Sequence, residues 1–182
     1  MAEKTFHSDI VYEGKLINLR KDKNKIGDRI FSREVVEHPG AVAIVPLLND
    51  KTILMIKQYR HPAGEFLFEI PAGTLEKNES AEKCAYRELI EETGYRAEKL
   101  TKLTSYYLAP GYSDEFIHIF LASDLKKTRQ KLENDEFIEV LFLNIKEVKE
   151  KIKNGSIKDA KTIAGILYLL LFISKYLSTS LK

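Results

Sequence analysis

The segment that runs from Ser80 to Gly94 constrains the fold most, because the period of the sequence changes there from strand-like to helical. Ala81, Ala85 and Leu89 recur every four residues, which is the spacing of one face of a helix. The glycine stands where a left-handed C-terminal cap belongs. The pattern predicts a helix that starts at the serine and stops just before the glycine.

Runs of apolar and β-branched residues on both sides of this helix predict strands. The predicted strands are Ala41–Leu48, Thr52–Tyr59, Phe66–Ile70, Leu100–Tyr107, Phe116–Ala122 and Phe137–Leu143, and further helices are predicted near Ile145–Lys153 and Asp159–Leu177. Strands interleaved with helices in this order indicate an α+β fold with a mixed central sheet and helices packed against it.

The first forty residues have a different pattern, in which short β-type runs such as Asp9–Tyr12 and Ile30–Val36 alternate with polar turns. They predict a small antiparallel sheet, and the chain therefore divides into residues 1–40 and a main domain of residues 41–182. A sheet of three strands has little core of its own. It must pack against the main domain or against a second subunit, and the sequence does not choose between them.

Composition excludes several classes of protein. The 182 residues include 44% hydrophobic residues and a single cysteine, Cys84, so the chain can bury a core but cannot form an internal disulfide. The N-terminus has no apolar stretch of the secretory type, which makes the cytoplasm the expected compartment. The apolar run from Ile163 to Ile173 is far shorter than the roughly 20 residues that span a membrane, and it predicts a buried C-terminal helix.

The charge balance excludes a second group of functions. Lys and Arg number 29 against 27 Asp and Glu, so the net charge is only +2 and gives no field that would attract nucleic acid or an anionic membrane. The basic cluster Arg20–Lys25 is short and interrupted by polar and acidic residues, and we interpret it as a solvated turn. An anionic ligand would have to be held by local groups.

The predicted helix carries three acids near its C-terminal end. Glu88 and Glu92 are four residues apart and share one face, with Glu91 beside them. No basic residue stands three or four positions from Glu88, and the negative end of the helix dipole disfavours acids there. A hard cation such as Mg²⁺ or Mn²⁺ would compensate this charge, and Zn²⁺ would not suit a set without nearby Cys or His. The alternative is a solvated acidic face.

The wider spacing favours the metal over the solvated face. Gly73, Glu79, the run from Arg87 to Leu89, the pair Glu91-Glu92 and the closing glycine at position 94 together resemble the Nudix box. The resemblance implies an α/β/α sandwich and an enzyme that cleaves a nucleoside diphosphate linked to another group.

The resemblance also implies roles for the residues of the box. Glu88 and Glu92, with the backbone carbonyl of Ala72, would ligate catalytic Mg²⁺, which Mn²⁺ could replace. We expect Gly73 to allow a tight loop before the helix. Arg87 would orient a neighbouring acid, either Glu91 or Glu79, and Glu91 is therefore either a metal ligand or a partner of the arginine.

A second resemblance concerns the substrate. Pro110 stands sixteen residues after Gly94, as in the ADP-ribose pyrophosphatase subfamily, and the chain matches that subfamily elsewhere as well. The other matching segments are REVVEH at residues 33–38, QYR at 58–60, EIPAG at 69–73 and DAKT at 159–162. The resemblance implies a homodimer in which the N-terminal sheets are exchanged.

The subfamily pattern implies three further contacts besides Pro110 at the substrate site. Arg60 would lie near the substrate phosphates, Arg33 in the substrate cleft of its own or the partner subunit, and Glu115 at the terminal ribose. Each could instead be an ordinary exposed or turn residue, but a guanidinium matches phosphate oxygens well. The candidate aromatic residues for stacking on adenine are Phe6, Tyr12, Tyr106 and Tyr107.

The general base is expected in the acidic segment before the strand at Phe137, which resembles a mobile catalytic loop of the family. Glu136 is the first choice as base or additional metal ligand because it is nearest the strand, and Glu133 and Asp135 are the alternatives. The preferred function is Mg²⁺-dependent hydrolysis of ADP-ribose to AMP and ribose 5-phosphate. The alternatives are hydrolysis of another nucleoside diphosphate sugar and a sensor that binds ADP-ribose without cleaving it.

Overall fold

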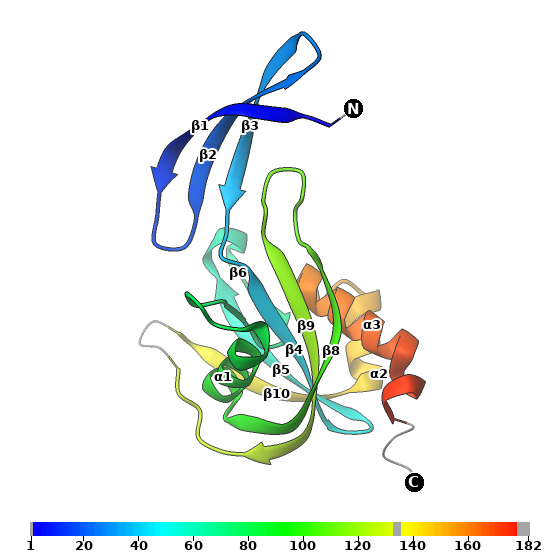
Figure 1. Cartoon of the computed structure of the whole chain (residues 1–182). Coiled ribbons are helices and arrows are strands. Elements are labelled where there is room, and N and C mark those ends of the chain that lie inside the picture. The colour runs from blue at the N-terminus through cyan, green and yellow to red at the C-terminus, as the bar shows by residue number, and fades with distance from the viewer. Residues whose placement is uncertain (1, 133–135, 178–182) are drawn as a thin grey trace.

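The computed structural model describes residues 2–132 and 136–177. Within them the chain forms a three-stranded antiparallel sheet followed by a seven-stranded mixed sheet with helices on both of its faces. Figure 1 shows the small sheet projecting from one end of the main body, and the helices α1, α2 and α3 all belong to that body. The predicted mixed sheet and the N-terminal antiparallel sheet are both confirmed.

The N-terminal sheet consists of β1 (Lys4–Glu13), β2 (Asn18–Ile26) and β3 (Arg29–Glu37) in that order. The interpretation of Arg20–Lys25 as a turn was wrong, because this segment lies inside β2 and pairs with both neighbouring strands. Its lysines point to solvent while Asp22 is buried.

A polar network replaces a hydrophobic core on this face of the sheet. Asp22 accepts hydrogen bonds from Ser8 Oγ at 2.7 Å and from Arg20 Nε at 2.8 Å, and Asn24 Oδ1 accepts one from Thr5 Oγ1 at 2.7 Å. The strand was missed because its alternation is between basic and polar residues, whereas the usual strand signal alternates apolar with polar residues.

The central sheet has the order β10-β5-β4-β9-β8, with two short strands paired beside β5 and β4. Only the β4–β9 pair in the described part of this sheet is parallel, with Ala41 opposite Ile117. The strands are β4 (Ala41–Asn49), β5 (Thr52–Arg60), β6 (Glu65–Glu69), β7 (Ala72–Thr74), β8 (Tyr95–Tyr107), β9 (Phe116–Lys127) and β10 (Ile138–Asn144), and a 3-10 turn, η1, covers His61–Ala63.

The helices are α1 (Ala81–Thr93), α2 (Ile145–Lys153) and α3 (Ala160–Leu177). The predicted helix is confirmed with its caps. Ser80 is the N-cap and its side chain accepts from the Lys83 N–H, while Gly94 is left-handed at φ 70° and its N–H donates to the carbonyl of Ile90. Residue 94 therefore requires the backbone freedom of glycine.

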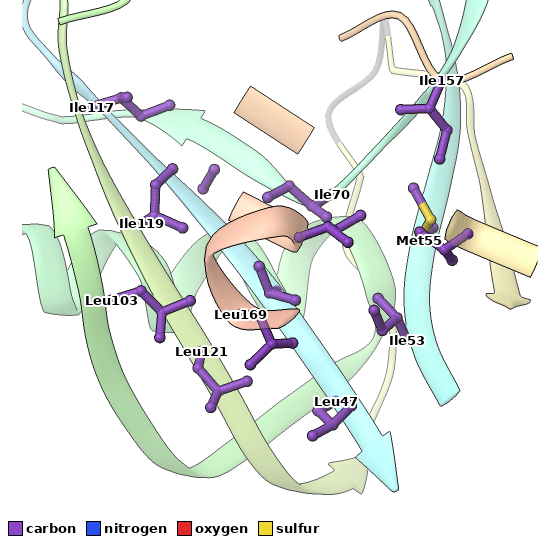
Figure 2. Close-up of a cluster of buried hydrophobic side chains, with 14 of the residues drawn as sticks. Leu47, Ile53, Met55, Ile70, Leu103, Ile117, Ile119, Leu121, Ile157 and Leu169 are labelled. Atoms are coloured by element: carbon purple, nitrogen blue, oxygen red, sulfur yellow. The ribbon is translucent and has the colours of Figure 1, made fainter. Parts of the chain in front are cut away.

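Two hydrophobic clusters lie on opposite faces of β4, since successive side chains of a strand point to opposite sides. Val42 and Ile44 pack with Ala85 and Leu89 of α1. Ala43, Val45 and Leu47 pack on the other face with Ile166 and Leu169 of α3, as Figure 2 shows for part of this cluster. The two clusters explain why β4 is an almost unbroken apolar run, and they confirm the α/β/α sandwich.

The apolar C-terminal run lies in α3, whose described side chains include Ile166 and Leu169 in the core. None of the helices in the described part of the chain is both long and apolar enough to cross a membrane.

The loop between β8 and β9 holds the N-terminal sheet to the body. The N–H of Val36 donates to the carbonyl of Tyr112 at 2.8 Å, and the N–H of Asp114 donates to the carbonyl of Val36 at 3.1 Å. The backbone N–H of His38 donates to Asp114 Oδ1 at 2.8 Å. This loop therefore fixes the point at which β3 passes into β4.

Candidate active site

The candidate site begins where α1 packs against β7. The backbone N–H of Ala72 donates to Glu92 Oε2 at 2.9 Å. A Cβ at Gly73 would lie 1.9 Å from Glu88 Oε1 and 2.0 Å from its carboxyl carbon, so no other residue fits there without displacing this carboxylate. We expected a tight loop at Gly73, but the residue lies in a strand, β7. A glycine is needed there because the Glu88 carboxylate occupies the space of a side chain.

Arg87 is the organising cation of the helix. Its Nε and Nη2 donate to the two carboxylate oxygens of Glu79 at 3.0 and 2.9 Å. Its Nη1 donates to Glu91 Oε2 at 3.0 Å and to Glu88 Oε1 at 2.6 Å. Both expected partners, Glu79 and Glu91, are therefore bound at once.

The expectation that Glu88 has no basic partner in its helix was wrong. Adjacent residues of a helix do not normally face each other. The long Arg87 side chain nevertheless reaches Glu88 because Glu79, from the segment before the helix, draws the guanidinium toward β7, where its Nη2 also donates to the carbonyl of Thr74 at 3.3 Å. This convergence depends on a contact between segments.

Burial strongly raises the pKa values of two acids of the helix, Glu88 and Glu92. Desolvation raises the pKa of Glu88 to about 6 although Arg87 opposes the change. Desolvation also raises the pKa of Glu92 to about 8, and the charges of Glu88 and Glu136 add to this effect against the Ala72 N–H. Hydrogen bonds from Arg87 instead lower the pKa of Glu79 to about 2. A cation that binds between Glu88 and Glu92 would favour their charged forms.

Glu88 and Glu92 line a cavity of about 240 Å³, which we call the carboxylate pocket. A larger cavity of about 480 Å³, which we call the cleft, adjoins it. Both are lined by Arg60, Ala72, Gly73 and Thr74, so the two cavities meet at this arginine. The carboxylate pocket is otherwise lined by Gln58, Arg87, Glu88, Glu91, Glu92 and Glu136.

The carboxylate pocket offers the ligands of a hard cation. Its oxygen donors include Glu88, Glu92 and the side-chain oxygen of Gln58, which is buried and has no hydrogen-bond partner within the described residues. No set of three His, Cys, Asp or Glu side chains in the described chain is arranged to enclose an ion. One or two carboxylates with several retained waters is the usual arrangement for Mg²⁺, so the residues fit this ion.

The cleft contains other predicted residues and some that were not predicted. Arg60 and Glu115 both line it. Glu69 and Lys161 line it as well, although the sequence suggested no role for them. Their signal was a lone acid in an otherwise apolar run and a basic residue in the first turn of the last helix. Gln58 was also missed, although its segment matched the subfamily.

Two predicted substrate residues lie outside both cavities. Arg33, on β3, donates to Glu3 Oε1 at 2.8 Å and lies over the ring of Phe31 at 4.6 Å. Pro110 belongs to the loop that fixes the end of β3. The fold of a single chain thus does not bring Arg33 to the cleft.

The predicted aromatic residues lie away from the cavities, whereas the predicted base lies at one of them. None of the four aromatic candidates lines either cavity as described. Tyr107 packs edge-to-face on Phe116 at 4.8 Å between ring centroids. Glu136 lines the carboxylate pocket, and its alternatives Glu133 and Asp135 lie outside the described residues.

Comparison with known proteins places the chain in a family. The model of the NUDIX domain family matches residues 37–165. The chain is 42% identical over 172 residues to an ADP-ribose pyrophosphatase of Bacillus subtilis, covering 93% of each chain. It is 39% identical over 170 residues to a methanol dehydrogenase activator of Bacillus methanolicus, covering 92% of each.

A solved structure described as an ADP compounds hydrolase shares the fold. It superposes with a TM-score of 0.83 at 19% identity, over 99% of this chain and 96% of the other. The family model covers well over half of the sequence, and it includes the whole segment that builds the carboxylate pocket. The chain therefore belongs to the NUDIX domain family.

Proposed function

We propose that this protein hydrolyses the pyrophosphate bond of ADP-ribose to AMP and ribose 5-phosphate with the help of Mg²⁺, which Mn²⁺ can replace. The observation that carries this proposal is the junction of the two cavities at Arg60. A pyrophosphate that lies across this junction has a guanidinium beside it and the buried acids of α1 next to its phosphorus atoms. The names of the 42% identical relative and of the solved structure support ADP-ribose as the substrate.

The residues of the carboxylate pocket would share the metal and proton work. Glu88, Glu92 and the carbonyl of Ala72 would hold the ion, and Arg87 would keep the acids oriented. When bound, the ion would polarise the pyrophosphate and lower the pKa of a nearby water. Glu136, which lines the same pocket, would accept the proton of that water at its carboxylate.

The cleft would hold the rest of the substrate. Arg60 would donate to phosphate oxygens, and Glu115 would accept hydrogen bonds from the hydroxyls of the terminal ribose. The backbone N–H of Glu115 donates to Ser113 Oγ at 3.1 Å, which fixes the backbone at this position. Apolar side chains such as Leu108 and Ile117 line the same cleft and can exclude water from the bound ligand.

The protein would act as a homodimer. Residues 1–40 would make the contact between the subunits, and residues 41–182 would form the catalytic domain. Every residue of β1 is exposed, and Ile10, Val11 and Tyr12 are 54%, 60% and 59% exposed. Apolar exposure of this extent supports burial against a second subunit. In such a dimer Arg33 could reach the partner's cleft. The buried free thiol of Cys84 suits the reducing cytoplasm that we propose as the compartment.

A hydrolysis panel tests the proposed substrate. Purified protein would be assayed with ADP-ribose, ADP-glucose and GDP-mannose in Mg²⁺, with products separated by chromatography. We expect AMP and ribose 5-phosphate from ADP-ribose at the highest kcat/KM. A tenfold or greater preference for another sugar nucleotide would contradict ADP-ribose as the substrate. Tight binding of ADP-ribose without any turnover would instead favour the sensor hypothesis.

A further inference from the structure

Arg60 is held by a buried acid that comes from the next strand. Its Nε donates to Glu69 Oε1 and its Nη2 donates to Glu69 Oε2, both at 2.7 Å. The Glu69 side chain is only 1% exposed, whereas that of Arg60 is 37% exposed. This two-point contact occupies one edge of the guanidinium and fixes its plane. The remaining nitrogen, Nη1, makes no hydrogen bond within the described residues and is available to a ligand at the junction.

The same carboxylate binds a second cation. Lys161 Nζ donates to Glu69 Oε2 at 2.5 Å and to Asp159 Oδ1 at 2.9 Å, and the lysine side chain is 12% exposed. Asp159 Oδ2 accepts from the Thr162 N–H at 2.9 Å, so the first turn of α3 holds the aspartate. The N–H of Ile70 donates to Thr162 Oγ1 at 2.9 Å and joins this turn to the residue after Glu69.

Stability alone does not explain why the chain keeps this network of buried charges. Buried ion pairs lose their hydration, and well-packed apolar residues often stabilise a fold as well or better. Two cations and two acids lie here, and all four residues line the wall of the cleft. When a cationic side chain in a substrate cleft is already ordered, it loses less conformational entropy as the ligand binds.

We infer that Glu69 and Lys161 are positioning residues, which hold the free edge of Arg60 toward the phosphates of the substrate. Glu69 sets the plane of the guanidinium, and Lys161 holds Glu69 in place from the start of α3. The inference rests on the proposed function, in which Arg60 contacts those phosphates. It predicts that Glu69 controls substrate affinity through its contact with Arg60.

The chain contains a matched control pair, with its acid on the same strand and its lysine just before α3. Lys158 Nζ donates to Glu65 Oε2 at 2.8 Å, and the two side chains are 56% and 43% exposed. Glu65 begins the strand that Glu69 ends, and Lys158 stands three residues before Lys161. Neither Glu65 nor Lys158 lines the cleft as described. Glu65 stands opposite Arg60 in the β5–β6 pairing, but its carboxylate binds Lys158 and not the guanidinium. Glu65→Gln therefore makes the same chemical change without removing a side-chain contact to Arg60.

The experiment compares Glu69→Gln, Arg60→Ala and the double variant. Binding of a non-hydrolysable methylene analogue of ADP-ribose is measured by calorimetry, and kcat and KM for ADP-ribose are determined separately. Glu69→Gln should weaken analogue binding and raise KM at least tenfold, with kcat within threefold of wild type. Adding Glu69→Gln to Arg60→Ala should weaken binding less than twofold further, because the two residues act as one unit. Glu65→Gln should behave as wild type.

The outcomes separate this inference from the proposed function. If Arg60→Ala leaves analogue binding unchanged, the proposed phosphate contact is wrong and the inference falls with it. A second outcome is that Arg60→Ala weakens binding but Glu69→Gln has no effect, and a third is that Glu69→Gln has its full effect in the double variant as well. In both cases the contact between Arg60 and the phosphates stands and the positioning role of Glu69 is wrong. Should Glu69→Gln fail to fold in thermal melts, Lys161→Met provides the test. It keeps the Arg60–Glu69 contact, and it should raise KM threefold to tenfold, whereas an unchanged KM would overturn the inference.

Discussion

The carboxylate of Glu88 occupies the space in which a side chain at Gly73 would begin. A Cβ at residue 73 would lie 1.9 Å from Glu88 Oε1. The close approach puts this acid against the backbone of β7, beside Ala72, whose N–H binds Glu92. The glycine of the box and the two acids of the helix are therefore one packing unit, although fifteen or more residues separate them in the chain.

Gly73→Ala should displace Glu88 and abolish most of the activity. We expect kcat/KM to fall at least a hundredfold, whereas the stability should change little, because the displaced atoms are the far end of the Glu88 side chain. Steady-state kinetics and urea denaturation measure the two effects. Gly111→Ala is the matched control, since no atom lies within 4 Å of a Cβ there. Wild-type kinetics in Gly73→Ala would show that Glu88 need not lie where it does.

Glu88→Gln and Glu92→Gln should each lower kcat at least a hundredfold, a loss of about 3 kcal/mol in transition-state stabilisation. Both acids are desolvated, and burial raises the pKa of each. Each variant should therefore melt at a higher temperature than wild type when EDTA removes divalent ions. Added Mg²⁺ should raise the melting temperature of wild type more than that of either variant. Near-normal turnover in either variant would refute the metal assignment.

The stability of the metal-free protein should fall as the pH rises. Burial raises the pKa of Glu92 from 4.5 to about 8, so the folded state holds a proton that the unfolded state releases. The stabilisation is complete below pH 4.5 and is lost as the pH rises to about 8. Denaturation in EDTA at pH 6.5, 7.25 and 8 should show the decline.

Two other groups change the stability in the opposite direction, but they do so outside this pH range. Burial lowers the pKa of His118 below its ordinary 6.5, which works in the other direction only below that pH. Arg87 lowers the pKa of Glu79 from 4.5 to about 2, and its contribution changes only in acid. Glu92→Gln is the control, and its unfolding free energy should change much less between pH 6.5 and 8, because Glu88, with a pKa of about 6, is already mostly ionised there. An equal slope in this variant would assign the effect to another group.

Arg33 provides a test of the proposed dimer. It lies outside the cleft of its own chain, so Arg33→Ala should lower activity only if the partner's cleft uses it. When Arg33→Ala and Glu88→Gln subunits are unfolded and refolded together, half of the dimers are mixed and each has one intact site. Activity should recover to about a quarter of wild type. No recovery on mixing would exclude a contribution from the partner subunit.

Local patterns predicted α1 and its caps because a helix of this kind is decided by residues within four positions of one another. Ser80 and Gly94 stand where the structure has its N-cap and C-cap. The apolar run at residues 41–48 likewise predicted a strand, which β4 confirms. The strand β2 was missed because its inward side chains, Asp22 and Asn24, are polar. They accept hydrogen bonds from hydroxyl groups of β1, and no hydrophobicity pattern records such contacts.

The sequence by itself determined elements such as α1 and β4, the spacing of Glu88, Glu91 and Glu92 on one helix, and the family resemblance that these residues carry. Tertiary structure alone decided that Arg87 binds three acids at once and that Glu69 meets Lys161 from a position 92 residues away. The physical reason is range. Helical and strand periods are set by neighbouring residues, whereas the partners of a buried charge depend on which distant segments the hydrophobic packing brings together.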